Sequence, residues 1–250
     1  RELAWRLHNG EMLEHIHDIC GTAYLTNEAP TESINLPSFE QVAENLDDYN
    51  RAFKLAAGQT NPASARPLVQ AHGNRQLVVN PPTDPLGEEQ LDRVYGLPFT
   101  RLPHPSYKET IPAYEQIRFS ITSHRGCFGG CAFCAITHHQ GKTIQSRSIE
   151  SIHNEVDRLT HHPEFKGTLS DVGGPTANMY GLCCGDPEAE ATCQRSSCLY
   201  PQRCKNLVTS GRQAVKMLQE IAGHPKVKHL FVASGIRYGL LDAQPDYFDQ

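Results

Sequence analysis

The sequence predicts an α/β protein in two parts that have different patterns. In the second part, strand-like runs alternate with amphipathic helices, and repeated βα units of this kind imply a parallel sheet or a (β/α) barrel. In the first part, one helix precedes two short β-rich runs, which is the pattern of a small α/β domain. Seven prolines lie between the two parts. We therefore expect two α/β domains joined by a proline-rich connection.

Residues 38–57 predict one amphipathic helix. Ser38 and Gln41 have the spacing of a capping box, and apolar side chains recur at steps of three and four residues along the segment. Gly58 follows the segment and is expected to end the helix.

Two short β-rich runs follow this helix and predict a hairpin. Residues 66–71 and 75–80 are separated by a turn centred on Gly73. Residues 1–80 are therefore predicted to be the C-terminal part of an N-terminal α/β domain. The seven prolines fall in residues 81–112, and because proline excludes a long helix or an interior strand, we place the connection there.

Residues 113–250 predict alternating strands and helices. One helix is expected to begin at Ser148, and a second at Ser210, with Gln213 as its capping partner and Gly223 as its end. Three strands are too few to close a barrel, so we expect only the first half of one. The strand-like runs are residues 116–123, 167–172 and 229–234.

The composition is that of a globular protein and excludes several classes. The chain has 250 residues, of which 38% are hydrophobic, and a net charge of −5 with scattered basic residues, so it does not resemble a general nucleic-acid binder. No apolar run approaches the ~18 residues of a membrane helix, and the start of the chain lacks the apolar core of a signal peptide. We expect a cytoplasmic protein. Its nine cysteines are then better explained as metal ligands or reactive thiols than as disulfides.

Three cysteines with the spacing C-x3-C-x2-C follow the first predicted strand of the second part. Cys127, Cys131 and Cys134 can hold three corners of a [4Fe–4S] cluster and leave one iron without a protein ligand. The glycines beside them, Gly126, Gly129 and Gly130, let the backbone wrap closely around an inorganic core. A zinc site is the alternative, and cysteines that only fill a core are another. A fourth zinc ligand would come from His124, His138 or His139.

This segment resembles the radical SAM superfamily. The resemblance rests on the cysteine spacing, on Phe133 just before the third cysteine, and on the position after the first barrel strand. The longer run FSITSHRGCFGGCAFCAITHHQGKTIQSRS looks like the YgiQ-like radical SAM proteins, whose reaction is unassigned. The upstream stretches VVNPPTDPL and LPFTRLPHPSYKE share the resemblance, which covers most of the chain. It implies that residues 113–250 form part of a radical SAM (β/α) barrel. Because the first residue is Arg1 rather than Met and the chain stops soon after the third strand, we expect a fragment.

The resemblance implies an enzyme that cleaves S-adenosylmethionine reductively at a [4Fe–4S] cluster. The products would be methionine and a 5′-deoxyadenosyl radical, which would abstract a hydrogen atom from a substrate that the sequence does not identify. The electron would come from a donor such as a flavodoxin or a ferredoxin. Two alternatives stay open: a non-catalytic zinc or iron–sulfur binding module, and an electron carrier whose first cluster is closed by a fourth thiolate.

The loops after the second and third strands hold further candidates for cofactor binding, because chemistry collects at the carboxyl ends of parallel strands. Gly173 and Gly174 resemble the glycine-rich segment that accepts the amino group of S-adenosylmethionine. No Glu follows them, which leaves backbone carbonyls or Thr176 for that role. Ser234 and Arg237 follow the third strand and predict a ribose or carboxylate contact. A tight turn and a solvent-facing arginine are the simpler interpretations.

Five more cysteines predict a second metal site between the second strand and the second helix. Their segment is rich in Gly, Pro, Arg and Ser and offers few apolar residues to bury them. A second iron–sulfur cluster, a structural zinc and redox-active thiols remain open. Cys20 stands apart and is predicted to lie in a core. The five are Cys183, Cys184, Cys193, Cys198 and Cys204.

Overall fold

The structure is a computed structural model that describes residues 2–248, and it divides into two compact units. The first unit contains the residues up to Asp84 together with Asp186–Ser196. The second contains Pro85–Gly185 together with the residues from Ser197 onward. The predicted limits of the domains stay a prediction. The stretch predicted as a connection includes one short helix, α4 (Glu88–Tyr95).

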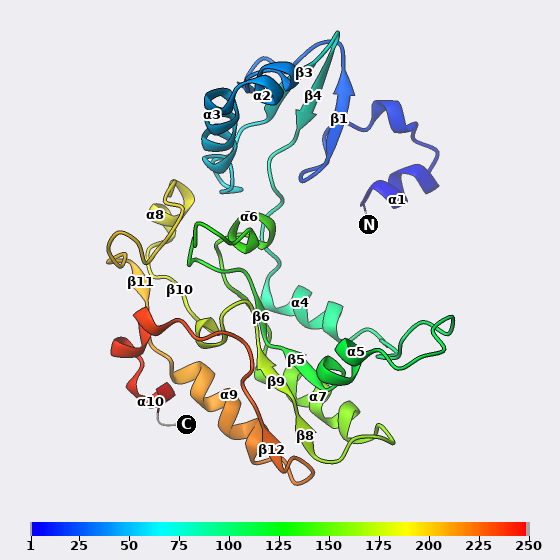
Figure 1. The fold of residues 1–250 in the computed structure, drawn as a ribbon, viewed down its shortest axis with the longest axis vertical. Coiled ribbons are helices and arrows are strands. Elements are labelled where there is room, and N and C mark those ends of the chain that lie inside the picture. Colours follow the sequence, from blue (N-terminus) through cyan, green and yellow to red (C-terminus); the bar gives the residue numbers. More distant parts are fainter. Residues whose placement is uncertain (1, 249–250) are drawn as a thin grey trace. The chain divides into compact units, whose positions relative to one another are not determined.

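The first unit is built on a four-stranded sheet with the order β1-β4-β3-β2. The predicted hairpin is confirmed, because β3 and β4 pair antiparallel and place the buried Val69 opposite the buried Val78. In Figure 1 the helices α2 and α3 lie beside this hairpin. The strands are β1 (Ala23–Thr26), β2 (Ile34–Asn35), β3 (Leu68–His72) and β4 (Arg75–Val79). The helical elements are α1 (Glu2–His8), η1 (Leu13–His15), α2 (Phe39–Glu44), α3 (Leu46–Ala57) and α8 (Pro187–Ala191).

The single helix predicted for residues 38–57 is wrong, because the structure divides it at Asn45. The backbone of Asn45 is extended, with φ −129° and ψ 120°, and its side chain accepts a hydrogen bond of 2.8 Å from Asp47 N. Asparagine is a strong N-cap, so it ends α2 and starts α3. The predicted capping box at the start of α2 is confirmed, since Gln41 N donates to Ser38 Oγ and Ser38 N donates to Gln41 Oε1.

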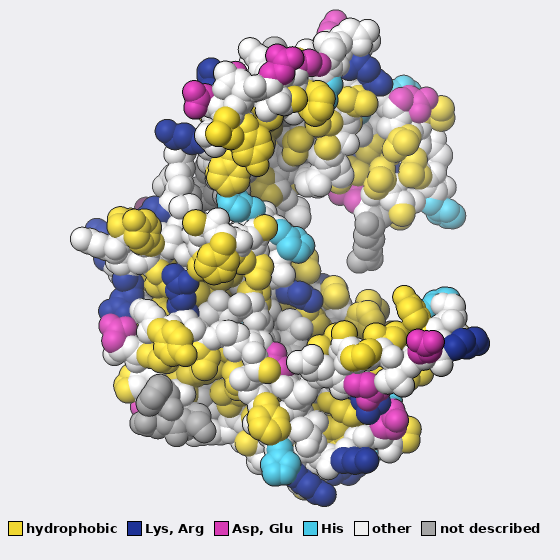
Figure 2. Space-filling model, in the orientation of Figure 1, with side chains coloured by type: hydrophobic (Ala, Val, Ile, Leu, Met, Phe, Trp, Pro, Cys, Tyr) yellow, Lys and Arg dark blue, Asp and Glu magenta, His cyan; other side chains and the backbone are white. Residues whose placement is uncertain are grey.

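The apolar stripe of these two helices remains at the surface of the described residues. Figure 2 shows hydrophobic side chains gathered over α2 and α3. Leu46 is 72% exposed, which shows that amphipathic spacing here predicts a helix but not a buried face. The large apolar side chains that are more than half exposed are Phe39, Leu46, Tyr49 and Phe53.

The second unit contains the predicted parallel sheet. Strand β5 pairs parallel with β9, and β8 pairs parallel with β12. The hydrogen bond from Val172 N to Phe231 O, 3.1 Å long, joins β9 to the end of β12, so the three predicted strands lie next to one another. They do not close into a barrel within the described residues. The strands are β5 (Ser120–Thr122), β8 (Thr168–Leu169), β9 (Asp171–Gly173) and β12 (His229–Leu230).

Each of the predicted strands is shorter than the sequence indicated. The first two residues of the run 116–123 belong to helix α5 (Pro112–Ile117), and a turn follows them. Pro112 occupies the first position of this helix, where a missing N–H costs nothing. The run 167–172 is interrupted at Ser170, and only the start of 229–234 forms a regular strand. The sequence did not indicate the antiparallel pair formed by β6 (His124–Arg125) and β7 (Gln145–Ser146).

The predicted helix at Ser148 is confirmed as α7 (Ile149–Thr160), with Ser148 Oγ accepting from Ser151 N at 3.0 Å. Helix α9 (Arg212–Ala222) ends at Gly223 as predicted. Its predicted capping box is wrong, because Gly211 is the N-cap and no side chain caps it. Gln213 instead packs on Gly181, where an added Cβ would lie 2.3 Å from Gln213 Oε1.

Helices α7 and α9 pack on the sheet and on each other to form the main core. Ile152 and Val156 of α7 and Ile221 of α9 have no exposed surface, which is the expected result of their helical spacing. Every helix within residues 2–248 is too short or too polar to cross a bilayer. The remaining elements of this unit are α6 (Ile136–Gln140), η2 (Ala177–Met179), β10 (Cys183–Cys184), β11 (Leu207–Val208), η3 (Tyr238–Ala243) and α10 (Pro245–Phe248).

Candidate functional site

The loop that carries the three clustered cysteines is fixed directly beyond β5 and β6. Cys127 N donates to Gly141 O at 3.1 Å, which ties the start of the loop to its end. Gly126 has φ +84°, and a Cβ added there would lie 2.1 Å from the carbonyl oxygen of Thr143. Only glycine fits this position, because any side chain would collide with backbone in a left-handed conformation.

Replacing Gly126 by alanine is therefore expected to destabilise the second unit. Gly141→Ala is the matched control, because Gly141 has φ +85° but open space around its Cβ position. The control is expected to cost ~1–3 kcal/mol for its backbone conformation alone, since Gly141 has φ +85° and ψ 168°. Gly126→Ala should cost about 2 kcal/mol more, since the Thr143 backbone must move. Chemical unfolding of the two variants measures the difference, and equal losses would show that the close approach does not matter.

Two of the three sulfurs lie around Gly129. A Cβ added to Gly129 would lie 3.3 Å from Cys127 Sγ and 3.8 Å from Cys131 Sγ. The Gly129 N–H donates to Cys127 Sγ at 3.4 Å. Cys127 is buried, whereas Cys131 and Cys134 are partly exposed, and none of the three forms a disulfide. The loop thus presents thiols close together, with a backbone donor that stabilises negative charge on sulfur.

The loop after β9 contacts the cysteine loop through Thr176. Thr176 Oγ1 lies 3.6 Å from Cys127 Sγ. The Gly173 carbonyl points to the neighbouring strand, where it accepts hydrogen bonds from Ser123 N at 2.6 Å and from Ser123 Oγ at 2.9 Å. A carbonyl oxygen has two lone pairs, so this one is fully used.

The loop after β12 reaches the same cysteines through Arg237. Arg237 Nη1 donates to Cys131 Sγ at 3.0 Å. The backbone of Arg237 is held by Asn178, which accepts from its N–H at 2.8 Å and donates to its carbonyl at 3.1 Å. At the start of this loop, the Asp171 carboxylate accepts from the N–H of Ser234 at 3.0 Å and from its hydroxyl. No sequence pattern indicates that Asn178 and Asp171 position this loop.

The structure brings together some of the predicted site residues and separates others. Ser234 lies against Gly173, where an added Cβ would be 2.6 Å from Ser234 Oγ. Cys134 N donates to Cys131 O at 3.0 Å, while the Phe133 side chain is 93% exposed. The role of each residue in binding a cluster or a cofactor stays a prediction. Two pairs of predicted residues are in contact, Cys127 with Thr176 and Cys131 with Arg237.

The His124 ring packs against Gly174 of the glycine pair, a role that the sequence did not indicate. Its side chain has no exposed surface, and its Nδ1 lies 2.9 Å from Ser123 Oγ. A Cβ added to Gly174 would lie 2.6 Å from His124 Cε1, so the ring packs directly on the backbone of that glycine. Burial lowers the pKa of His124 to about 4 from its ordinary value of 6.5.

This pKa predicts a loss of stability in acid. Because the folded state binds the proton more weakly, the contribution of His124 is complete above pH 6.5 and is lost as pH falls from 6.5 toward 4. The shift corresponds to about 3 kcal/mol at most. Urea unfolding at steps through this range should show a steeper pH dependence for the unaltered protein than for His124→Asn. The exposed His8→Asn variant is the control, and an identical slope in all three proteins would contradict the assignment.

The described residues contain no ready-made site for a single metal ion. Within residues 2–248, no three side chains of His, Cys, Asp or Glu lie close enough together to hold one. The predicted second site stays a prediction, and its cysteines fall in different places. Cys193 belongs to the first unit, where Asn61 Nδ2 donates to its carbonyl at 3.0 Å. The other four belong to the second unit, where Cys204 N donates to Cys198 O at 2.7 Å.

Comparison with known proteins agrees with the cysteine motif. The family described as Radical SAM N-terminal matches residues 1–120, a stretch that ends before the cysteine loop. A UPF0313 protein of Geobacter sulfurreducens is 52% identical over 250 residues, which cover 99% of this chain and 41% of that protein. A UPF0313 protein of Methanocella arvoryzae is 48% identical over 98% of this chain and 41% of its own length. A UPF0313 protein of Bradyrhizobium diazoefficiens is 41% identical over 100% of this chain and 41% of its own length.

These findings identify the class of protein. The chain belongs to the radical SAM superfamily. It spans about two fifths of the length of the curated relatives it matches. Within the superfamily, it belongs to the UPF0313 family of YgiQ-like proteins.

Proposed function

We propose that the protein is a radical SAM enzyme that cleaves S-adenosylmethionine reductively at a [4Fe–4S] cluster bound by Cys127, Cys131 and Cys134. The observation that carries this proposal is the meeting of three loops. The cysteine loop, Thr176 and Arg237 follow adjacent parallel strands and contact one another at the carboxyl ends of those strands. Active sites of barrel enzymes form at this end, where loops from several strands converge.

The residues present fit an iron–sulfur cluster. The donors are thiols, which iron–sulfur clusters prefer, and Gly129 leaves room beside two of the sulfurs. A cluster distributes its thiolates over separate irons, so the sulfurs need not converge on one point as they would around a single ion. The N–H of Gly129 and the guanidinium of Arg237 both donate to cysteine sulfur. Such donors stabilise the negative charge of a thiolate-bound cluster.

The bound cluster and cofactor would supply the electron transfer that breaks a carbon–sulfur bond and generates a 5′-deoxyadenosyl radical. The chain's own residues hold and orient them. Three thiolates leave one iron for the amino and carboxylate groups of S-adenosylmethionine. Since Gly173 O is fully used by Ser123, the acceptors for the ammonium group are the Thr176 hydroxyl and the carbonyls of Gly174 and Pro175. The remaining nitrogens of Arg237 suit the carboxylate.

The reaction needs partners that lie outside this chain. A flavodoxin or ferredoxin would supply the electron, and the substrate that loses a hydrogen atom is unassigned. Binding a cluster requires reduced cysteines, which the cytoplasm maintains, and we place the protein there.

Product analysis tests the proposal. The full-length protein is purified and reconstituted without oxygen, reduced with dithionite and mixed with S-adenosylmethionine. Liquid chromatography with mass spectrometry is expected to show 5′-deoxyadenosine and methionine in equal amounts, and neither without the reductant. A loaded cluster that gives no cleavage would favour the electron carrier. Zinc in place of iron would favour the non-catalytic module.

A further inference from the structure

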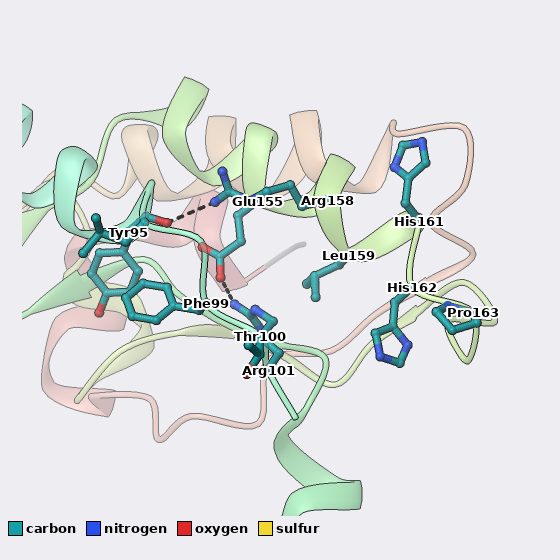
Figure 3. Close-up of a pocket in the computed structure, with 11 residues that line it drawn as sticks. Tyr95, Phe99, Thr100, Arg101, Glu155, Arg158, Leu159, His161, His162 and Pro163 are labelled. Carbon is teal, nitrogen blue, oxygen red and sulfur yellow. Dashed lines mark hydrogen bonds and ion pairs between the residues drawn. The ribbon is translucent and has the colours of Figure 1, made fainter. Parts of the chain in front are cut away.

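A pocket in the second unit lies apart from the three loops that carry the proposed chemistry. It has a volume of about 310 Å³, which is within the range of small-ligand sites. Its lining comes from the second half of α7 with the residues just after it, and from the last residue of α4 with the segment that follows (Figure 3). The second half of α7 leads into β8, whereas the cysteine loop precedes α7. The pocket shares no residue with the predicted cluster or cofactor contacts.

The pocket combines apolar walls with an excess of positive charge. Tyr95, Phe99 and Leu159 line the pocket with apolar groups. Phe99 is 61% exposed, whereas Leu159 is only 3% exposed, so the apolar surface that is open to solvent comes mainly from Phe99. Two guanidinium groups line the same pocket, those of Arg101 and Arg158. An apolar wall beside cationic donors is the usual composition of a site for an organic anion.

The acidic residue in the lining does not neutralise both arginines. One oxygen of Glu155 pairs with Arg101, and the other pairs with Arg147 behind the pocket. Figure 3 shows the Glu155 carboxylate directed to Arg101, while Arg158 is directed to the backbone of Tyr95. Arg158 Nη2 donates to Tyr95 O at 3.0 Å, and among residues 2–248 no carboxylate forms an ion pair with Arg158. Arg158 is exposed and keeps donors for a ligand.

Arg101 is held in an unusual conformation. Its φ of +53° is the one left-handed value recorded for a non-glycine residue in the described chain. Arg101 Nη1 donates to the carbonyls of Arg118 and Ser120, at 3.2 Å and 3.1 Å, and its own carbonyl accepts from Tyr114 Oη at 2.9 Å. Such strain persists where the surroundings fix it, and it gathers at ligand sites.

The two guanidiniums also repel each other. Burial and then the charge of Arg158 lower the pKa of Arg101. An anion bound at Arg158 would relieve this repulsion, in addition to forming its own hydrogen bonds.

We propose that this pocket binds a small organic anion, with its carboxylate or phosphate on the guanidinium of Arg158 and a flat apolar body against Tyr95, Phe99 and Leu159. Arg101 remains paired with Glu155. It adds positive charge to the pocket but donates no hydrogen bond to the ligand. The site is independent of the cluster and of cleavage of S-adenosylmethionine, because none of its residues belongs to those loops.

Isothermal titration calorimetry of the full-length protein tests the proposal with four probes. Phenyl phosphate and benzoate carry both the anion and the ring, benzamide carries the ring without charge, and inorganic phosphate carries charge without the ring. Phenyl phosphate or benzoate is expected to bind at least about tenfold more tightly than either incomplete probe. Benzamide lacks the charged hydrogen bond, and inorganic phosphate lacks the apolar burial of the ring, and each is worth about that much.

The variant Arg158→Gln is expected to weaken binding of phenyl phosphate about tenfold or more. Arg93→Gln, at an exposed arginine in the last turn of α4, is the matched control and should leave binding unchanged. Circular dichroism of both variants establishes that they fold. The proposal fails if neither aromatic anion binds saturably, or if Arg158→Gln binds phenyl phosphate like the unaltered protein. Equal affinity for inorganic phosphate would also overturn it, since the apolar wall would then contribute nothing.

Discussion

Replacing Cys127 by serine is expected to abolish the iron–sulfur cluster and cleavage of S-adenosylmethionine together. Cys127 is the most buried of the three thiols, and it contacts both Gly129 N–H and Thr176. Serine has nearly the same shape but is a poor ligand for iron. Because changes in residues that only support a metal ligand cost 10–100-fold, loss of the ligand itself should lower cleavage by more than about 100-fold.

Two measurements check this prediction: iron and sulfide content after reconstitution, and the rate of 5′-deoxyadenosine formation. Cys20→Ser is the control. Cys20 was predicted to lie in a core, but it is exposed in the first unit, so its replacement should change neither quantity. A Cys127→Ser protein that keeps its full iron content would show that the cluster is bound elsewhere in the protein.

The second large effect concerns stability and is expected for Glu155→Gln. Arg147 has no exposed surface, and its ion pair with Glu155 lies in the middle of the second unit. Burial lowers the pKa of Arg147 to about 10, which leaves it charged at neutral pH. Removing the carboxylate leaves that charge buried without a counter-ion, at a cost of ~3–5 kcal/mol.

Unfolding in guanidinium chloride measures the loss. Glu164→Gln is the matched control, because the Glu164 side chain is 58% exposed and its partner Arg118 also pairs with Glu115. An exposed pair of this kind is worth at most ~1 kcal/mol. If both variants lost the same small amount, Arg147 would have to find compensation that the structure does not show.

Much of the second unit follows from local patterns in the sequence. Ser148 starts α7, and the spacing of apolar residues identifies the face of α7 that is buried. The parallel pairing of three strands follows from their alternation with helices. The helix features are predictable because they depend on residues that are close together in the chain. The pairing is predictable because strands joined through a helix usually lie parallel and next to each other in one sheet.

The errors arise where local signals compete or where distant residues decide. Asn45 caps both the end of α2 and the start of α3. The apolar periodicity continues across this break, so it wrongly predicted a single helix. The Ser210 and Gln213 spacing fits a capping box, but tertiary packing on Gly181 takes the Gln213 side chain away. In the same way, Pro112 starts a helix in a stretch whose apolar residues resemble a strand.

In the candidate site, too, local patterns were predictable and contacts between distant residues were not. Spacing in the sequence makes the three cysteines the candidate cluster ligands, because the chemistry of a cluster demands several thiols in one short loop. The roles of His124 and Asp171 depend on loops that meet only in the folded chain. The pocket beside Arg158 joins residues about 60 positions apart, and neither segment has a motif that would indicate it.

Electron paramagnetic resonance of the dithionite-reduced, full-length protein tests the central claim most directly, with and without S-adenosylmethionine. If Cys127, Cys131 and Cys134 hold a cluster with one open iron, a reduced-cluster signal will appear and its shape will change when S-adenosylmethionine is added. The same signal will be absent from a variant in which all three cysteines are alanine. A signal that ignores S-adenosylmethionine, or one that survives in the variant, would contradict the claim.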